Sequence, residues 1–201
     1  MKDLLNVPNL LTLGRIFFII PILYLFEIGN YKVGILLLVI AMLTDFFDGY
    51  LARKLNQTTR IGAILDPIAD KLILLILFGY LIYYNVSPLW YFLILCTRNI
   101  LQLSAIPILL LWKKIDFKVQ PKLIPKLATT LAFIILFYYL FDFVVSKDSS
   151  FAKAYSYTSH SLTQLLVFLL LVVSTLVEIF ILVTFIPRFI KIYLRKHDTF
   201  E

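Results

Sequence analysis

The sequence has little cysteine, histidine or charge. Cys96 is the single cysteine in 201 residues, so one chain can build neither a disulfide nor a site of several thiolates. The two histidines, His160 and His197, fall in a predicted loop and in the C-terminal tail, where we expect them to be solvated. Charged residues make up 15% of the chain and hydrophobic residues 61%, whereas soluble domains are roughly 45–50% apolar. These values exclude a disulfide-stabilised protein and favour a protein of the lipid bilayer.

The hydrophobic residues fall into stretches of about 20, the length that a helix needs to cross a bilayer. We predict an all-α, polytopic membrane protein with six transmembrane helices that form a single domain over residues 1–201. Because Lys2 precedes the first stretch and no small-residue cleavage site follows it, we expect this stretch to be retained as a span. The predicted helices are Leu10–Phe26, Val33–Leu55, Ala63–Tyr84, Pro88–Trp112, Leu123–Val145 and Leu162–Pro187.

The net charge of +7 is distributed unevenly along the chain. Basic residues concentrate in the second-to-third link, in the fourth-to-fifth link and in the tail: Arg53, Lys54, Arg60, Lys113, Lys114, Lys118, Lys122, Lys126, Arg188, Lys191, Arg195 and Lys196. Because basic loops stay on the cytoplasmic side of a membrane, both termini are predicted to be cytoplasmic. Such a surface also attracts anionic lipid headgroups, by about 1 kcal/mol per basic residue near the interface. The charge therefore needs no nucleic-acid partner, and none is expected.

Four aspartates lie near the linked ends of two consecutive predicted helices. Asp45 and Asp48 lie near the end of the second helix, and Asp66 and Asp70 near the start of the third. Spacings of three and four place each pair on one helix face, and the short link allows the two faces to meet. Two carboxylates about 5 Å apart repel by roughly 3 kcal/mol, so protons or cations must intervene. Oxygen ligands favour hard cations such as Mg²⁺, Mn²⁺ or Ca²⁺, and a pair of metal ions suits phosphoryl transfer.

Small and basic residues surround these acids. Gly49 and Gly62 leave the backbone open to a ligand, and Arg53 offers a forked donor that matches phosphate. Together they predict a cavity for a diphosphate. The alternative interpretation is that the acids lie at the membrane interface and pair with neighbours such as Arg53 or Lys71. The presence of four acids at helical spacing makes this interpretation less favourable.

The residues from Asp45 to Asp70 match the pattern D-x2-D-G-x2-A-R-x8-G-x3-D-x3-D without a departure. This pattern resembles the signature of the CDP-alcohol phosphatidyltransferases. The resemblance covers most of the chain, because that family also has six spans, cytoplasmic termini and an amphipathic N-terminal segment, expected here as a short juxtamembrane helix. It further implies a bacterial inner or cell membrane location, membrane lipids as surroundings and homodimer formation.

The resemblance implies a role for each residue of the motif. Asp45, Asp48 and Asp66 would hold two metal ions, Mg²⁺ or Mn²⁺, while Asp70 would touch one metal and act as general base on an acceptor hydroxyl. The acceptor oxygen would attack the phosphorus that bears diacylglycerol and expel CMP. The motif residues expected to lie against the CDP-lipid are Gly49, Arg53, Thr59 and Gly62.

The opening segment resembles the start of the phosphatidylglycerophosphate synthases and of the related cardiolipin synthases. By that resemblance Asn9 and Thr12 would reach the cytidine. The alternative is an ordinary helix start at Pro8 and Asn9, with Thr12 facing lipid headgroups.

Two basic residues are candidates to bind the acceptor's phosphate. Arg98 lies inside the fourth predicted helix, where a cation needs a partner; an ion pair with an acid is the alternative to acceptor binding. Lys126 matches a Gly-Lys position of the family, with Pro125 in place of the glycine, and a snorkelling interface lysine is its alternative. Asn99 stands where those synthases commonly have an acid, and Glu178 lies within a span without a visible partner.

The leading prediction is transfer of the phosphatidyl group of CDP-diacylglycerol to glycerol 3-phosphate, giving phosphatidylglycerophosphate and CMP. Within the same family, the alternative is a cardiolipin synthase that uses phosphatidylglycerol, or another CDP-alcohol transferase. From a different class, the alternative is a cation transporter with an intramembrane carboxylate site. Transporters tend to place such sites near the midplane between inverted repeats, whereas these acids are predicted at one membrane face and no internal repeat is visible.

Overall fold

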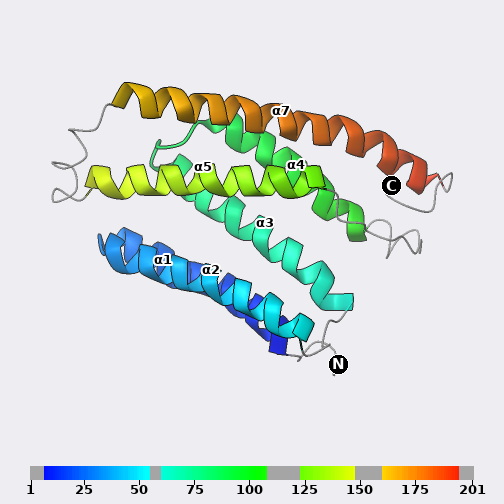
Figure 1. The fold of residues 1–201 in the computed structure, drawn as a ribbon, viewed down its shortest axis with the longest axis horizontal. Coiled ribbons are helices and arrows are strands. Elements are labelled where there is room, and N and C mark those ends of the chain that lie inside the picture. The colour runs from blue at the N-terminus through cyan, green and yellow to red at the C-terminus, as the bar shows by residue number, and fades with distance from the viewer. Residues whose placement is uncertain (1–6, 55–59, 108–122, 148–159, 195–201) are drawn as a thin grey trace. The chain divides into compact units, whose positions relative to one another are not determined.

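The computed structural model describes residues 7–54, 60–107, 123–147 and 160–194 (Figure 1). Every regular element in these ranges is an α-helix, which confirms the all-α prediction for this part of the chain. The helices are α1 (Val7–Glu27), α2 (Tyr31–Lys54), α3 (Arg60–Tyr83), α4 (Leu89–Pro107), α5 (Leu123–Lys147) and α7 (His160–Tyr193). A juxtamembrane helix preceding α1 would fall outside the described residues and stays a prediction.

The last helix runs past the proline at which the sequence predicted its end. α7 contains Pro187 and continues to Tyr193. A proline removes one backbone hydrogen bond from a helix interior, but the apolar periodicity continues beyond it: Ile192 is buried, whereas Ile190 is half exposed. The expected end at Pro187 is therefore wrong, because the hydrophobic pattern outweighs the loss of one bond.

Within the described ranges, two helices are long and apolar enough to cross a membrane, over Leu123–Lys147 in α5 and Thr163–Tyr193 in α7. Shorter apolar helical segments occupy Ile16–Glu27 in α1 and Tyr31–Leu43 in α2. These features support a membrane protein, and the full set of six spans stays a prediction.

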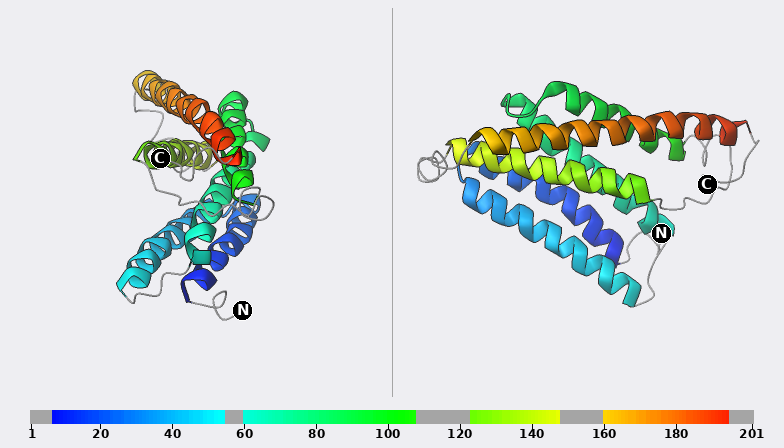
Figure 2. Two further views of the ribbon diagram at one scale, coloured as in Figure 1. Left: turned by 90° about the vertical axis from the view of Figure 1, so that its right-hand side faces the viewer. Right: turned by 45° about the horizontal axis from the view of Figure 1, so that its top comes forward.

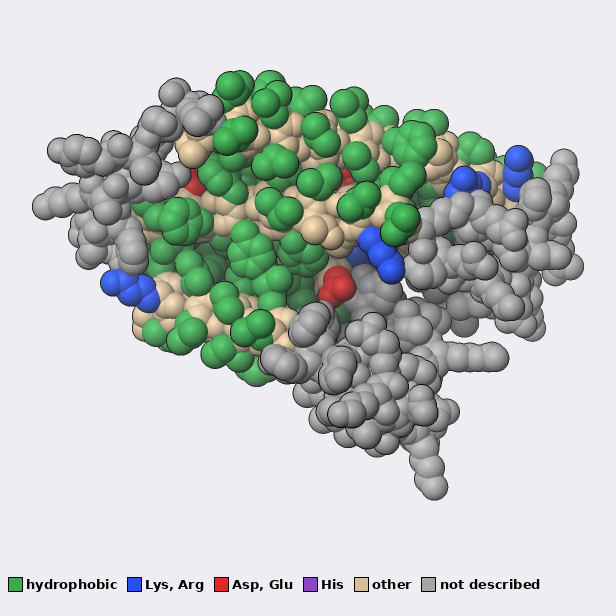
Figure 3. Space-filling view, in the orientation of Figure 1, with side chains coloured by type: hydrophobic (Ala, Val, Ile, Leu, Met, Phe, Trp, Pro, Cys, Tyr) green, Lys and Arg blue, Asp and Glu red, His purple; other side chains and the backbone are tan. Residues whose placement is uncertain are grey.

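The α7 helix buries two polar side chains and exposes many large apolar ones, unlike a soluble amphipathic helix. Ser174 and Glu178 are 0% exposed, whereas Leu176 is 62% and Val183 63% exposed. Hydrophobic side chains cover most of the visible face of α5 and α7, and Lys and Arg lie toward the helix ends (Figure 3). A helix that hides polar groups and presents apolar ones is adapted to lipid, where a polar group needs an internal partner.

The described contacts divide the chain into two units. Residues 1–76 with 146–149 form the first unit, and residues 77–145 with 150–201 the second. The helix α3 contributes to both. The prediction of a single domain over residues 1–201 is not tested by this division and stays a prediction.

In the first unit, α1 and α2 form a helical hairpin and lie side by side (Figures 1 and 2). The turn is a Schellman cap, in which the Gly29 amide donates to the Phe26 carbonyl at 3.1 Å and the Asn30 amide to the Leu25 carbonyl at 2.8 Å. Gly29 has a φ of +78°, the left-handed conformation that this cap requires. Gly34 of α2 then lies close against the buried ring of Phe26, and the absence of a side chain on Gly34 permits this approach.

In the second unit, α3 ends in the same kind of cap. The Asn85 amide donates to the Ile82 carbonyl and the Val86 amide to the Leu81 carbonyl, both at 2.9 Å. Asn85 has a φ of +55°, a conformation that asparagine tolerates better than most residues. This turn leads into α4.

The α4 and α7 helices of the second unit contact each other directly. On each helix several buried residues recur at intervals of three or four, the spacing of one helical face. They include Tyr91, Leu95 and Arg98 on α4, and Leu171, Ser174, Glu178 and Ile181 on α7.

Candidate active site

The acidic motif lies on the end of α2 and the start of α3. Asp45 and Asp48 belong to α2, which ends at Lys54, and Asp66 and Asp70 belong to α3, which begins at Arg60. The helical spacing predicted for each pair is therefore present in the backbone. At a rise of 1.5 Å per residue, Asp48 lies about 9 Å before the end of α2 and Asp66 about 9 Å after the start of α3. The two pairs thus lie at similar distances, measured along their helices, from the segment that joins α2 to α3.

Of the four acids, Asp70 alone has a described side chain. It is half-buried on α3, next to Ala69, which is fully buried. No group of three or more His, Cys, Asp and Glu that could hold a metal ion occurs among the described side chains, and Asp45, Asp48 and Asp66 are outside that set. Convergence of the four carboxylates is therefore untested and stays a prediction.

The side chains predicted to contact the CDP-lipid also lie outside the described set. The structure places the backbone of most of them on helices, and their roles stay predictions. They are Asn9 and Thr12 on α1, Gly49 and Arg53 on α2, Gly62 on α3, and Thr59 outside the described residues.

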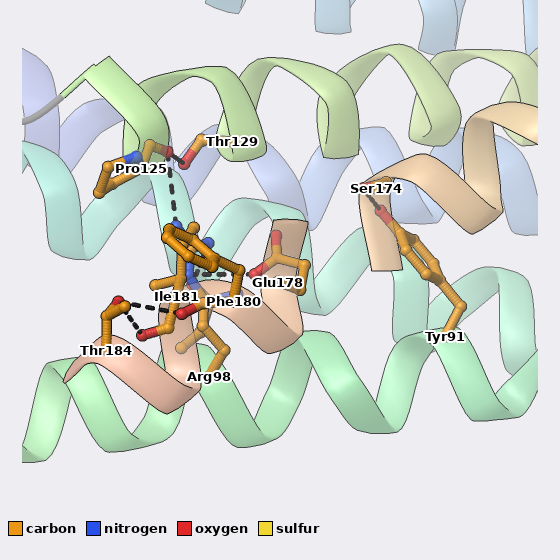
Figure 4. Close-up of polar contacts among 10 residues, drawn as sticks. Tyr91, Arg98, Pro125, Thr129, Ser174, Glu178, Phe180, Ile181 and Thr184 are labelled. Atoms are coloured by element: carbon orange, nitrogen blue, oxygen red, sulfur yellow. Dashed lines mark hydrogen bonds and ion pairs between the residues drawn. The ribbon is translucent and has the colours of Figure 1, made fainter. Parts of the chain in front are cut away.

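Arg98 of α4 is buried against α7. It is 1% exposed, and its Nε lies 3.2 Å from Oε2 of Glu178, which is 0% exposed (Figure 4). A single charge at the centre of a spanning helix costs roughly 2.5–3.5 kcal/mol on insertion scales. Each of these two charges therefore lowers the free-energy cost of burying the other. This ion pair is the alternative that the sequence left open for Arg98. Acceptor binding by the same residue stays a prediction.

The Arg98 guanidinium also reaches α5. Its Nη2 donates to the Pro125 carbonyl at 3.5 Å, and its Nη1 donates to Oδ1 of Asn99 at 3.3 Å. The Pro125 carbonyl also accepts a shorter hydrogen bond, from the Thr129 hydroxyl at 3.0 Å. Figure 4 shows Arg98 between Pro125 and Glu178. Arg98 therefore links α4 to both α5 and α7.

Lys126 directly follows Pro125 in the chain. Its side chain is exposed on the first turns of α5, and its carbonyl accepts the Thr130 hydroxyl at 3.0 Å. Because Arg98 contacts Pro125, the structure brings the guanidinium of α4 to the residue beside Lys126. Arg98 therefore contacts the residue that precedes Lys126 in the chain, and acceptor binding by either residue stays a prediction.

Sequence reasoning did not identify Glu178 as the partner of Arg98. The signal was present, since two charges of opposite sign each lie inside an apolar helix, where both need compensation. It also missed the contact between the hydroxyl groups of Tyr91 and Ser174, 2.8 Å apart in the same interface (Figure 4).

A family model described as CDP-alcohol phosphatidyltransferase matches residues 5–187. The match spans most of the chain and includes the complete motif from Asp45 to Asp70. The chain belongs to the CDP-alcohol phosphatidyltransferase family. The resemblance read from the motif is thereby confirmed.

Curated relatives of this CDP-alcohol phosphatidyltransferase share one name, "CDP-diacylglycerol--glycerol-3-phosphate 3-phosphatidyltransferase". The Rickettsia typhi protein is 55% identical over 71 residues, 34% of this chain and 40% of its own length. The Aquifex aeolicus protein is 44% identical over 94 residues, 45% of this chain and 53% of its own. The Bacillus subtilis protein is 37% identical over 109 residues, 47% of this chain and 56% of its own. The chain spans about half the length of the curated relatives it matches.

Proposed function

We propose that the chain transfers the phosphatidyl group of CDP-diacylglycerol to glycerol 3-phosphate, forming phosphatidylglycerophosphate and releasing CMP. The observation that carries the proposal is the complete family motif, whose four aspartates lie on the helical backbone of α2 and α3. The common name of the relatives supports glycerol 3-phosphate as the acceptor.

The aspartates Asp45, Asp48, Asp66 and Asp70 would hold two divalent cations, Mg²⁺ or Mn²⁺. Their chemistry fits such ions, because hard cations prefer carboxylate oxygens. Each pair also has the helical spacing that puts both carboxylates on one face. When bound, the ions neutralise the negative charge of a diphosphate during phosphoryl transfer.

The protein's own groups would bind the donor and move one proton. Arg53 would bind the diphosphate through its forked donors, while Gly49 and Gly62 leave room for the nucleotide to approach the backbone. Asp70 would accept the proton of the acceptor hydroxyl as that oxygen attacks phosphorus and CMP departs. A carboxylate close to cations is a weak base, so its contribution comes mainly from placement. The cytidine would be bound by Asn9, Thr12 and Thr59.

Arg98 and Lys126 would bind the phosphate of the acceptor. Arg98 contacts the carbonyl of Pro125, the residue before Lys126, and this contact supports a shared site at the start of α5. A phosphate monoester carries a charge of about −1.5 to −2 at neutral pH, whereas the phosphodiester of phosphatidylglycerol carries a single negative charge. The charge of Lys126 and the N–H donors of Arg98 would therefore favour glycerol 3-phosphate over phosphatidylglycerol.

The proposal also includes orientation and assembly. With six spans in a bacterial cell membrane, the basic residues near the motif and in the tail favour an orientation with both termini and the active site on the cytoplasmic side. A homodimer is also proposed, by resemblance to the family.

An acceptor panel tests the function. The purified protein, with Mg²⁺ and CDP-diacylglycerol, is offered glycerol 3-phosphate, phosphatidylglycerol and other alcohols, and CMP release is measured. We expect CMP with glycerol 3-phosphate. Release with phosphatidylglycerol alone would instead identify a cardiolipin synthase. No CMP with any acceptor would refute the transferase, and cation uptake into proteoliposomes would then test transport.

A further inference from the structure

The Arg98 guanidinium is buried, yet its five N–H groups are poorly satisfied. The contact between Nε and Oε2 of Glu178, at 3.2 Å, is an ion pair without the alignment of a hydrogen bond. The bonds from Nη1 to Asn99 and from Nη2 to Pro125 measure 3.3 and 3.5 Å, longer than the usual N–H···O distance. A buried donor with such weak partners is unfavourable and calls for an explanation.

The two edges of the guanidinium differ in what they contact. The Nε edge lies against the carboxylate of Glu178, which balances the charge of Arg98. The Nη groups contact neutral oxygens, and the carbonyl of Pro125 is already bonded to the Thr129 hydroxyl at 3.0 Å. An anionic oxygen would replace these long contacts by charge-assisted bonds, which are shorter and stronger.

We propose that Glu178 is a positioning residue for the acceptor site. From α7 it holds the Nε edge of Arg98, so that the Nη groups remain near Pro125 and bind a phosphate oxygen of the acceptor. This inference rests on the proposed function, because it takes glycerol 3-phosphate as the anion. Glu178 itself does not touch the substrate.

The competing explanation is that Glu178 only neutralises a buried charge and ties α4 to α7. A matched control exists one helical turn earlier on α7, where Ser174 contacts Tyr91 of α4 at 2.8 Å. Both of these side chains are fully buried, and the contact joins the same two helices without including Arg98. Its loss therefore reports the structural effect alone.

Kinetic constants of the full-length chain separate the two explanations. We expect Glu178→Gln to raise the KM for glycerol 3-phosphate by roughly 10- to 100-fold, the loss that follows when a charged donor is displaced. The KM for CDP-diacylglycerol should change little. Glu178→Asp, which keeps the charge but withdraws it by one methylene, should give an intermediate KM for the acceptor. Ser174→Ala should lower the midpoint of thermal unfolding and leave both KM values unchanged.

An unchanged KM for glycerol 3-phosphate in Glu178→Gln would overturn the inference. The proposed function would still stand, provided that the wild type is active with this acceptor. If Glu178→Gln does not fold, the same comparison with Glu178→Asp decides. If the wild type uses a different phosphate-bearing acceptor, the proposed function is wrong and the KM for that acceptor tests Glu178. If no acceptor supports turnover, equilibrium titration with glycerol 3-phosphate decides: weaker binding to the variant supports the inference, and equal binding overturns it.

Discussion

The hydroxyl groups of Tyr91 and Ser174 lie 2.8 Å apart between α4 and α7, and both side chains are 0% exposed. Tyr91→Phe removes this bond but keeps the ring, which packs edge-on against Phe78 with ring centroids 5.7 Å apart. Hydrogen bonds between membrane helices contribute about 0.6 kcal/mol on average and up to roughly 1.7 kcal/mol. We expect Tyr91→Phe to lower the free energy of unfolding by an amount within that range, as measured by denaturation in detergent micelles.

A double-mutant cycle provides the control for this prediction. Ser174→Ala removes the same bond, so the double variant should be little less stable than either single variant. The Ser174 hydroxyl left in Tyr91→Phe can turn to a carbonyl of its own helix, which limits the loss. Fully additive losses would contradict a direct contact.

The second prediction concerns the close approach of α1 and α2 at Gly34. A Cβ at this position would lie 2.5 Å from Cε1 and 2.7 Å from Cδ1 of Phe26. The Phe26 ring is 1% exposed and cannot move aside without disturbing the hairpin core. We expect Gly34→Ala to lower the free energy of unfolding by about 1–3 kcal/mol, the usual result of overpacking, seen as a lower thermal midpoint.

Gly79 of α3 provides the matched control. A Cβ there would meet Cζ of Phe92 at 3.8 Å, an ordinary contact. Alanine is a better helix former than glycine by about 1 kcal/mol, so Gly79→Ala should be neutral or slightly stabilising. Equal effects of the two substitutions would show that helix propensity, not the approach of Phe26, determines the result at Gly34.

The positions of the helices could be predicted from the sequence because polar and turn-forming residues interrupt each apolar stretch. The predicted end at Phe26 is one residue from the observed end at Glu27, where Gly29 supplies the cap. The predicted end at Tyr84 is likewise one residue from Tyr83. The end at Pro187 was wrong because a proline removes only one bond and the apolar pattern continued.

The candidate site could be predicted only where its residues follow one another on one or two adjacent helices. The aspartate motif is local, so its spacing was readable from the sequence. The pairing of Arg98 with Glu178 joins α4 to α7 and depends on how each helix is rotated about its axis. Neither helix specifies that rotation alone, since packing against the other elements decides which face is buried.

The third prediction is that divalent cations stabilise the folded protein as well as support turnover. Carboxylates crowded at one site repel each other until cations bind, and binding to the folded state stabilises it by about 2.7 kcal/mol at 100 times the Kd. EDTA should abolish CMP release and lower the thermal midpoint, and Mg²⁺ should restore both. Asp48→Asn should lose the Mg²⁺-dependent shift, whereas Asp142→Asn, on α5 outside the motif, should keep it. A wild-type midpoint that does not respond to Mg²⁺ would argue against a cation site.

The fourth prediction assigns Asp70 as the base. Asp70→Asn keeps the size of the side chain but removes its ability to accept a proton, and a general base contributes typically about 10²- to 10⁴-fold. We expect CMP release to fall by that factor. Binding of CDP-diacylglycerol, measured by equilibrium titration, should remain mostly intact because Asp45, Asp48 and Asp66 are unchanged. A near-normal rate would remove Asp70 from this role.

The last prediction distinguishes the two ends of α5. Lys126 is exposed near the start of the helix, beside the carbonyl that Arg98 contacts, and Lys147 is exposed at its end. Because an exposed charge is screened by solvent, Lys126→Ala should raise the KM for glycerol 3-phosphate by only roughly two- to fivefold, and Lys147→Ala should not change it. The wild-type KM should also rise with ionic strength more steeply than that of Lys126→Ala, because salt weakens the attraction that the variant has already lost. Equal salt dependence in the two proteins would mean that Lys126 is an interface lysine that does not contact the acceptor.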